Sequence, residues 1–362
     1  MAVKGTVLVA GAGGLVGRAV IDHFLGERDF DVIALSRTPP SPATGARHIG
    51  VDLTDAAACR AKLGEIRNLT HIVYAALFEK ADLTQGWLDA DQIATNLVML
   101  TNLLDAIEPG NPTLHHISLL QGAKAYGVHL GQIPVPARES APRHIHPNFY
   151  WAQEDFLAAR QAGKAWSWTI FRPQVVFGFA QGSMMNMVTA VGAYAAISRQ
   201  LGLPLVYPGI GSRVTEATDA RLLARAISWA GRSSNAANQT FNVTNGDVLT
   251  WENLWPVISS AFAMPIGLPH PMPLARIMPG HAATWAAIVA RYGLQDITLD
   301  KLVSGSWQFA DFAFSRTHST SSLLSTIKIR QAGFADCIDT EASLGWWLGR
   351  MQELRYLPPP EA

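Results

Sequence analysis

The chain has 362 residues, of which 49% are hydrophobic and 15% charged, a composition that suits a large core and excludes a disordered chain. Its 28 Lys and Arg residues balance its 28 Asp and Glu residues, which argues against nucleic acid or an anionic membrane as the partner. Two cysteines give neither a disulfide framework nor metal-ligand spacing. No signal peptide or membrane span is indicated, so we expect a cytoplasmic protein that takes a small neutral molecule and no metal.

Short β-branched runs alternate with amphipathic stretches in the first half of the chain, which is the pattern of parallel βαβ units. The predicted strands span 6–10, 31–36, 71–76, 114–119 and 166–172. Between them, segments such as 15–25 and 96–107 repeat apolar residues every three or four positions, as helices do. The pattern predicts an α/β fold with a Rossmann-type doubly wound parallel sheet.

The alternation fades after residue 178. Segments 204–209 and 240–246 are predicted as late strands that return to the sheet, whereas 183–203 and 251–300 are predicted as helices rich in Met, Trp and Pro. We therefore expect a dinucleotide-binding Rossmann domain over 1–182, with returning strands near 204–248. Residues 183–203 and 249–362 are expected to form a smaller, mostly helical substrate-binding lobe.

A glycine loop, GAGGLVG, joins the first strand to the first helix. Gly11, Gly14 and Gly17 permit a tight turn and the close approach of a pyrophosphate, which the helix N-terminus would attract. One glycine triplet is weak evidence by itself, but its place after the first strand favours a dinucleotide site. Leu15 and Val16, which open the helix, are included in the predicted contacts.

The second strand ends in Ser36 and Arg37, where a protein that prefers NAD would place Asp or Glu. Arg37 can pair with a 2′-phosphate and stack on adenine, so NADPH (NADP+) is the expected cofactor. The alternative is a solvated surface arginine. Asp52 and Leu53 complete this end of the predicted site, although Asp52 could equally cap a loop or a helix.

The segment NFYWAQED, residues 148–155, contains a tyrosine at the position of the catalytic tyrosine of short-chain reductases. Four residues after Tyr150, however, the usual lysine is replaced by Glu154. A lysine does occur at the end of an earlier strand, Lys124 in the loop QGAKAYG. The strand end Arg172–Pro173 follows the tyrosine segment.

These motifs resemble the progesterone 5β-reductase/iridoid synthase family, which are atypical extended short-chain dehydrogenase/reductases. The resemblance lies in the Gly-x-Lys loop at 122–124, the tyrosine segment at 148–155 and the Arg-Pro strand end, and segments 284–295, 307–314 and 325–340 extend it over most of the chain. It implies NADPH-dependent reduction of the C=C bond of an activated enone or enal (an ene-reductase). The implied partner is a small lipophilic enone or enal.

The resemblance also implies roles for individual residues. Tyr150 would hydrogen-bond the enolate oxygen, while Lys124 would lower the pKa of Tyr150 and contact the nicotinamide ribose. Pro173 and Val175, with Gln174 between them, would present backbone to the nicotinamide carboxamide. Glu154 is interpreted as a helix-surface or capping carboxylate. Without the resemblance, Tyr150 would read as a structural tyrosine and Lys124 as a solvated loop lysine.

Methionine and aromatic side chains form the predicted substrate pocket, because they suit an adaptable apolar cavity. At helical spacing the same residues could equally be plain core. The candidates are Phe149, Met184, Met185, Met187, Trp307 and Phe309.

Two other functions remain open. A carbonyl reductase or epimerase of the extended short-chain class is disfavoured by the missing lysine after Tyr150. A non-catalytic NADP(H)-sensing protein is disfavoured by the presence of Tyr150 together with Lys124. The sequence leaves open the physiological substrate, the product stereochemistry, side activity on ketones and whether the chain forms a homodimer.

Overall fold

A seven-stranded parallel sheet forms the centre of the computed structural model, which describes residues 5–209, 211, 213–314 and 321–360. The strands stand in the order β3-β2-β1-β4-β5-β6-β9, and every pairing is parallel. Their bounds are Gly5–Ala10 (β1), Phe30–Ser36 (β2), Arg47–Gly50 (β3), His71–Tyr74 (β4), His116–Leu120 (β5), Ser167–Pro173 (β6) and Gln239–Val243 (β9). The central strands are almost wholly buried, as expected for a sheet covered on both faces.

The strand order reverses between β1 and β4, because the chain first builds outward to β3 and then starts again at β4 on the other side. In open α/β sheets the carboxyl ends of the strands at such a switch point leave a crevice in which ligands bind. The loops that follow β1, β4, β5 and β6 all leave this edge of the sheet. Of the predicted site residues, they contain Gly11, Gly14, Lys124 and Val175.

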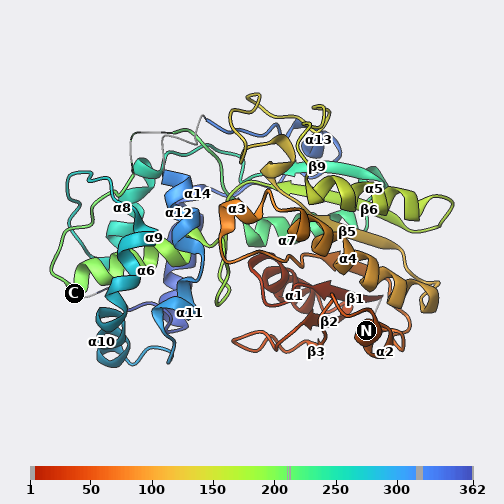
Figure 1. Ribbon diagram of the computed structural model, residues 1–362, viewed down its shortest axis with the longest axis horizontal. Helices are drawn as coiled ribbons and strands as arrows, with labels where there is room; N and C mark the ends of the chain where they lie inside the picture. The colour runs from red at the N-terminus through yellow and green to blue at the C-terminus, as the bar shows by residue number, and fades with distance from the viewer. Residues whose placement is uncertain (1–4, 210, 212, 315–320, 361–362) are drawn as a thin grey trace.

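Helices cover both faces of the sheet (Figure 1). On one face α1 (Leu15–Glu27) packs beside α7 (Ala220–Ala230). On the other face α4 (Ala90–Ile107) packs between α2 (Ala56–Leu63) and α5 (Phe149–Gln161). The two faces have separate hydrophobic cores, so each layer of helices holds the sheet independently.

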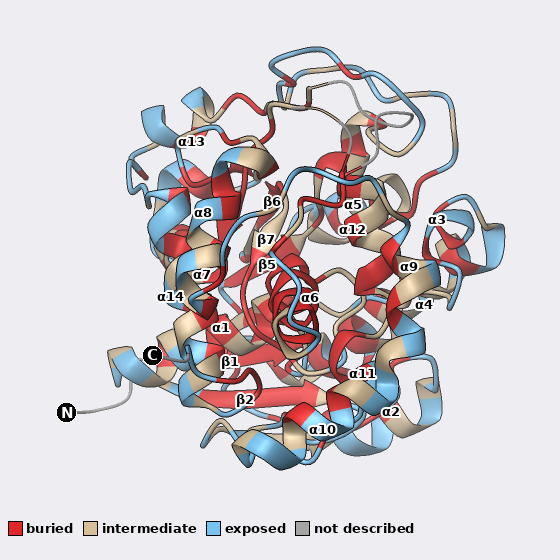
Figure 2. Ribbon diagram, turned by 90° about the vertical axis from the view of Figure 1, so that its left-hand side faces the viewer, coloured by how far each residue is buried: buried red, intermediate tan, exposed pale blue. Residues whose placement is uncertain are grey.

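A mostly helical lobe lies beside the sheet domain, on the left of Figure 1. Its central helix is α6, which is buried from Met187 to Ser198 and appears red in Figure 2. The core of the lobe is continuous with the core under α1 and α7. The lobe helices are α6 (Met187–Gln200), α8 (Trp251–Phe262), α9 (Leu274–Ile277), α10 (Ala282–Tyr292), α11 (Leu299–Val303), α12 (Ser306–Phe314) and α14 (Thr340–Glu353).

Short elements complete the chain. A two-stranded sheet pairs β7 (Val176–Phe177) with β8 (Thr218–Asp219) beyond the end of β6. The remaining elements are α3 (Leu83–Gly86), α13 (Ile327–Gln331) and the 3₁₀ turns η1 (Glu108–Gly110), η2 (Ala123–Tyr126), η3 (Ser234–Ala236) and η4 (Met278–His281).

The predicted Rossmann-type sheet is confirmed, and each of the first five predicted strands is present within a few residues of its expected bounds. The segment 240–246 contributes β9, as predicted. The strand predicted at 204–209 is wrong, since Leu205 forms only an isolated bridge with Ile266. Pro204 and Pro208 lack the backbone N–H groups that a strand would need there.

Within the described ranges, no helix is both long enough and apolar enough to cross a bilayer.

Candidate active site

The glycine loop packs closely against the end of β4 and connects β1 to the start of α1. Gly11 has a φ of 85°, and a Cβ there would lie 2.5 Å from the backbone of Ala75. A Cβ on Gly17 would lie 2.2 Å from the carbonyl oxygen of Gly11. Gly14 stands at the N-cap of α1, where no side chain caps the helix. The loop therefore combines a close backbone with uncapped helix N–H groups, which are the features that an anionic group requires.

The end of β2 forms the opposite wall of the same crevice. The hydroxyl of Ser36 donates to the carbonyl of Thr38 at 2.7 Å, and the exposed Arg37 lies between them in sequence. Hydrogen bonds from the backbone and hydroxyl of Thr54 lower the pKa of Asp52, and the charge of Arg37 lowers it further. Asp52 thus caps a turn, one of the two roles left open by the sequence, while Arg37 supplies positive charge to this end of the crevice.

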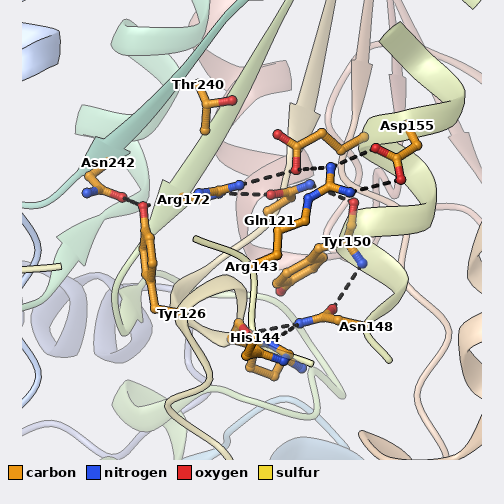
Figure 3. A network of polar contacts seen from close by, with 12 residues as sticks. Gln121, Tyr126, Arg143, His144, Asn148, Tyr150, Asp155, Arg172, Thr240 and Asn242 are labelled. Carbon is orange, nitrogen blue, oxygen red and sulfur yellow. Dashed lines mark hydrogen bonds and ion pairs between the residues drawn. The ribbon is translucent and has the colours of Figure 1, made fainter. Parts of the chain in front are cut away.

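Asn148 fixes the position of Tyr150. Its side-chain oxygen accepts the backbone N–H of Tyr150 at 3.0 Å (Figure 3), and its amide donates to the carbonyl of Lys124 at 2.9 Å. One asparagine therefore ties the first turn of α5 to the loop after β5. That loop also approaches the phenol closely, because a Cβ on Gly122 would lie 3.3 Å from the Tyr150 hydroxyl.

Tyr150 is buried, and its ring meets that of Phe149 edge-on with centroids 4.4 Å apart. Burial raises the pKa of Tyr150, the negative charge of Glu79 raises it further, and Arg172 opposes both. Lys124 is not among the described groups that shift the pKa of Tyr150, and its effect on that pKa stays a prediction. The phenol is a neutral hydroxyl at physiological pH, able to donate a hydrogen bond.

Lys124 is paired with Glu79 on the wall of the crevice. Its Nζ lies 3.4 Å from Glu79 Oε1, and the two side chains are only 11% and 5% exposed. Burial lowers the pKa of Lys124, whereas the charge and hydrogen bond of Glu79 raise it. Gln92 donates to the other carboxylate oxygen at 2.7 Å, and the ring of Trp87 lies 4.4 Å from Nζ. The lysine therefore enters the site as one half of a compensated ion pair.

Glu154, in place of the usual lysine, lies beneath Tyr150 and balances a buried arginine. Its Oε2 lies 3.3 Å from an Nη2 atom of both Arg172 and Arg143. Arg172 also donates to Gln121, whose amide donates to the carbonyl of Tyr150 (Figure 3). The interpretation of Glu154 as a surface or capping carboxylate is wrong, because the side chain is 18% exposed and compensates the guanidinium of Arg172.

A cavity of about 1000 Å³ runs from the glycine loop to Tyr150 and the helical lobe. Most of the predicted site residues line it, namely Gly11, Gly14, Leu15, Val16, Ser36, Arg37, Asp52, Leu53, Lys124, Phe149, Tyr150, Pro173, Val175, Met184, Met185 and Phe309. Gly17 is not on the wall and packs under the loop instead. Met187 and Trp307 are also outside the cavity, because α6 and α12 direct both side chains into the core of the lobe.

The end of β6 reaches the cavity through Pro173, Gln174 and Val175. Of these, Gln174 donates its backbone N–H to the hydroxyl of Thr218 at 3.2 Å. Its side-chain amide donates to the Ser322 hydroxyl at 2.6 Å. Gln174 thus anchors this turn to neighbouring segments and does not present its N–H to the cavity.

Two residues of this wall, Glu79 and Trp87, were missed by sequence reasoning. Both follow β4, in a stretch that departs from the motifs used for the resemblance. Their position in the sequence could have indicated them. β4 and β5 are neighbours in the sheet, so residues that follow β4 can face the loop that contains Lys124.

Fold and site together define the class of the protein. A glycine loop after β1, a tyrosine in the first turn of α5 and a mostly helical lobe over the strand ends are features of an extended short-chain dehydrogenase/reductase. The family model of the PRISE-like Rossmann-fold domain matches residues 7–315. The chain belongs to this family.

Curated relatives span nearly the whole chain. An (S)-8-oxocitronellyl enol synthase of Camptotheca acuminata is 31% identical over 97% of this chain and 93% of its own length. The corresponding enzyme of Antirrhinum majus is 31% identical over 86% of this chain and 80% of its own. A short chain dehydrogenase of Penicillium aethiopicum is 29% identical over 98% of this chain and 99% of its own.

Solved structures share the fold at low sequence identity. A UDP-glucose 4-epimerase of Thermotoga maritima superimposes with a TM-score of 0.67 and 16% identity, covering 96% of this chain and 99% of its own. The terminal R domain of the myxalamid PKS-NRPS pathway gives 0.65 and 14%, covering 100% and 94%. These likenesses concern the fold alone.

Proposed function

We propose that the protein is an oxidoreductase that uses NADPH to reduce the C=C bond of activated enones and enals. The observation that carries the proposal is the state of Tyr150, a buried hydroxyl on the cavity wall whose pKa is raised and which has no lysine four residues later. Such a group suits donation of a hydrogen bond better than transfer of its proton.

The glycine loop and the end of β2 fit the cofactor. Gly11 and Gly14, with the uncapped start of α1, would hold the pyrophosphate. Arg37, exposed at the cavity wall, would pair with the 2′-phosphate, and no acidic residue stands beside it at the end of β2. NADPH, when bound, supplies the hydride for the reaction.

Tyr150 would stabilise the charge that develops on the substrate oxygen. When hydride adds to the β-carbon, the π electrons shift and the carbonyl oxygen becomes an enolate, which needs a donor. A pre-positioned donor of this kind typically contributes about 3–4 kcal/mol to the transition state. The proton can then come from water at the α-carbon, so the phenol keeps its own proton throughout and no relay behind it is required.

Lys124 would act on the reaction as part of its pair with Glu79. Because Glu79 neutralises the lysine, the pair places little net charge next to the apolar cavity wall. The ammonium is still held beside Trp87 and Phe149, on the wall that also contains Tyr150. This arrangement supports a role in binding the cofactor ribose or the substrate, with no requirement that Lys124 change the pKa of Tyr150.

The relatives support the same chemistry. Two of them are named as synthases of 8-oxocitronellyl enol, and an enol is the neutral form of the product of hydride addition to a conjugated carbonyl compound. Carbonyl reduction is the competing reaction, in which the tyrosine must give its proton to the alkoxide. The raised pKa of Tyr150 and its lack of a lysine relay favour the conjugate reaction.

The test is NADPH consumption with 2-cyclohexen-1-one and a panel of larger enones and enals, with identification of the product. We expect a saturated ketone or aldehyde. Tyr150→Phe should lower kcat by about 10²- to 10³-fold, the usual effect of removing one oxyanion donor. Tyr194→Phe is the matched control, because it removes a buried tyrosine hydroxyl that donates to Val206 in the lobe, outside the cavity wall.

Each alternative has its own signature. An allylic alcohol as the product would assign the protein to carbonyl reduction. Tight NADPH binding without turnover on the whole panel would favour a sensing protein. Equal losses of kcat in Tyr150→Phe and Tyr194→Phe would contradict the proposed role of Tyr150 as the hydrogen-bond donor to the substrate.

A further inference from the structure

Arg213 differs from the other charged side chains on the cavity wall. Five of them line it. Lys124 forms an ion pair with Glu79 beside Tyr150, and the charge of Arg37 acts on Asp52 at the glycine-loop end. Arg213 forms no ion pair with any residue that the structure describes. It is a half-buried cation that faces the cavity, and no acid among the described residues balances it.

The place of Arg213 is the lobe side of the cavity. The residue lies on the connection between α6 and β8. The same cavity is lined by Met184 and Met185 before α6 and by Phe309 and Ala313 of α12. The guanidinium of Arg213 therefore lies on a largely apolar part of the cavity wall.

The local energetics are unfavourable for Arg213 as it stands. Its Nε is buried and has no hydrogen-bond partner in the described part of the chain. Burial lowers the pKa of Arg213, and only Tyr207 opposes this effect. A buried, unpaired N–H of a charged group is unfavourable, and an anionic ligand that accepts from it would offset this cost.

We propose that Arg213 binds a carboxylate of the substrate, so that the protein acts on an enone or enal with an acid group beyond an apolar spacer. This inference rests on the function proposed above and narrows its substrate class. The planar guanidinium can donate two parallel hydrogen bonds to a carboxylate. The apolar wall of Met184, Met185 and Phe309 would contact the spacer, and Tyr150 the reacting carbonyl oxygen.

The test compares (E)-8-oxonon-6-enoic acid with its methyl ester, together with homologues of longer and shorter spacer, at fixed NADPH. In Arg213→Gln we expect the KM for the acid to rise on the order of 10- to 100-fold, the effect of losing a charge-assisted hydrogen bond, with kcat nearly unchanged. The ester should be turned over equally well by both proteins. Arg276→Gln is the matched control, because it removes one exposed arginine of the same lobe.

The ester also reports on folding, since a misfolded variant would lose both substrates. Equal KM values for acid and ester in the parent protein, or equal changes in Arg213→Gln, would overturn the inference while leaving enone reduction intact.

If no compound is reduced, the proposed function fails and binding alone decides the inference. Calorimetric titration of the saturated acid, 8-oxononanoic acid, should then show binding to the parent and at least tenfold weaker binding to Arg213→Gln. No binding to the parent, or binding that the variant retains, would reject the carboxylate site.

Discussion

The carboxylate of Glu154 lies 3.3 Å from the guanidinium of Arg172, directly beneath the helix turn that carries Tyr150. Glu154 occupies the sequence position of the lysine in ordinary short-chain reductases, so the charge at this position is inverted and directed away from the site. The charges of the buried Arg172 and of Glu154 neutralise each other. Replacing either residue alone would leave the other unbalanced.

Restoring the lysine should therefore damage the protein and fail to convert it. Glu154→Lys places a third cation beside Arg172 and Arg143, and we expect a loss of about 3 kcal/mol, since breaking a buried pair typically costs 3–5 kcal/mol. Thermal unfolding would show this as a drop of several degrees in Tm. A variant of parental stability that gained ketone reduction would show that Glu154 only substitutes for the lysine. Asp155→Lys is the control, because Asp155 pairs with Arg143 on the exposed surface.

The Lys124–Glu79 pair makes a second prediction, on stability. Lys124→Met leaves the carboxylate of Glu79 buried without its cation and should cost about 3 kcal/mol. Glu79→Gln leaves the buried ammonium and should cost a similar amount. The double variant removes both charges, so most of the stability should return while activity stays low. Urea unfolding of the parent, the two single variants and the double variant measures the coupling free energy between Lys124 and Glu79. If the two losses of stability simply add in the double variant, the two residues do not stabilise the protein as an ion pair.

The fold could be predicted from the sequence because its evidence is local. Strand periods of two, helix periods of three to four and the glycine loop each act over a few residues, and the sheet followed from them. The sequence did not reveal which residues far apart along the chain are in contact.

Three outcomes illustrate the limit. The pairing of Lys124 with Glu79 joins loops after different strands, and that of Glu154 with Arg172 joins a helix to a strand, so no spacing rule reveals them. Trp307 and Phe309 are two residues apart on one helix, yet only Phe309 lines the cavity. Composition cannot distinguish the cavity face of a helix from its core face when both faces are apolar.

Packing at the glycine loop predicts that two glycine-to-alanine substitutions in α1 change the stability of the protein in opposite directions. Gly17→Ala would place a Cβ 2.2 Å from the Gly11 carbonyl, so α1 must shift and the loop with it. We expect a loss of about 1–3 kcal/mol and weaker binding of NADPH, measured by fluorescence titration. Gly26→Ala in the same helix meets no atom within 4 Å and should stabilise the protein by about 0.5–1 kcal/mol. Equal behaviour of the two variants would refute the close approach.

Cofactor preference should depend on Arg37. Arg37→Gln removes the charge at the end of β2, and we expect the Kd for NADPH to rise about 10- to 100-fold, as for loss of a charge-assisted hydrogen bond. NADH has no 2′-phosphate, so its Kd should stay within about twofold. The two titrations on parent and variant give the selectivity directly. An unchanged ratio would mean that Arg37 is a solvated surface arginine and that another group selects the cofactor.

The buried carboxyl of Glu216 should make stability depend on pH. It accepts the backbone N–H of Leu324 at 2.6 Å, and burial raises its pKa from 4.5 to about 7. The folded protein therefore favours the protonated acid. This contribution is fully present below the unfolded pKa of 4.5 and is lost as the pH rises through about 7. Its upper limit is about 3 kcal/mol, since one pKa unit corresponds to 1.36 kcal/mol.

Glu216→Gln keeps the acceptor for Leu324 but cannot ionise. Relative to the parent, its Tm should gain several degrees between about pH 5 and pH 8, the range in which the parent must bury a developing charge. Glu65→Gln, at an exposed carboxylate, should follow the parental curve throughout. If the curves of Glu216→Gln and the parent run parallel across this range, Glu216 is ionised in the folded protein already at pH 5, and the hydrogen bond from Leu324 outweighs burial.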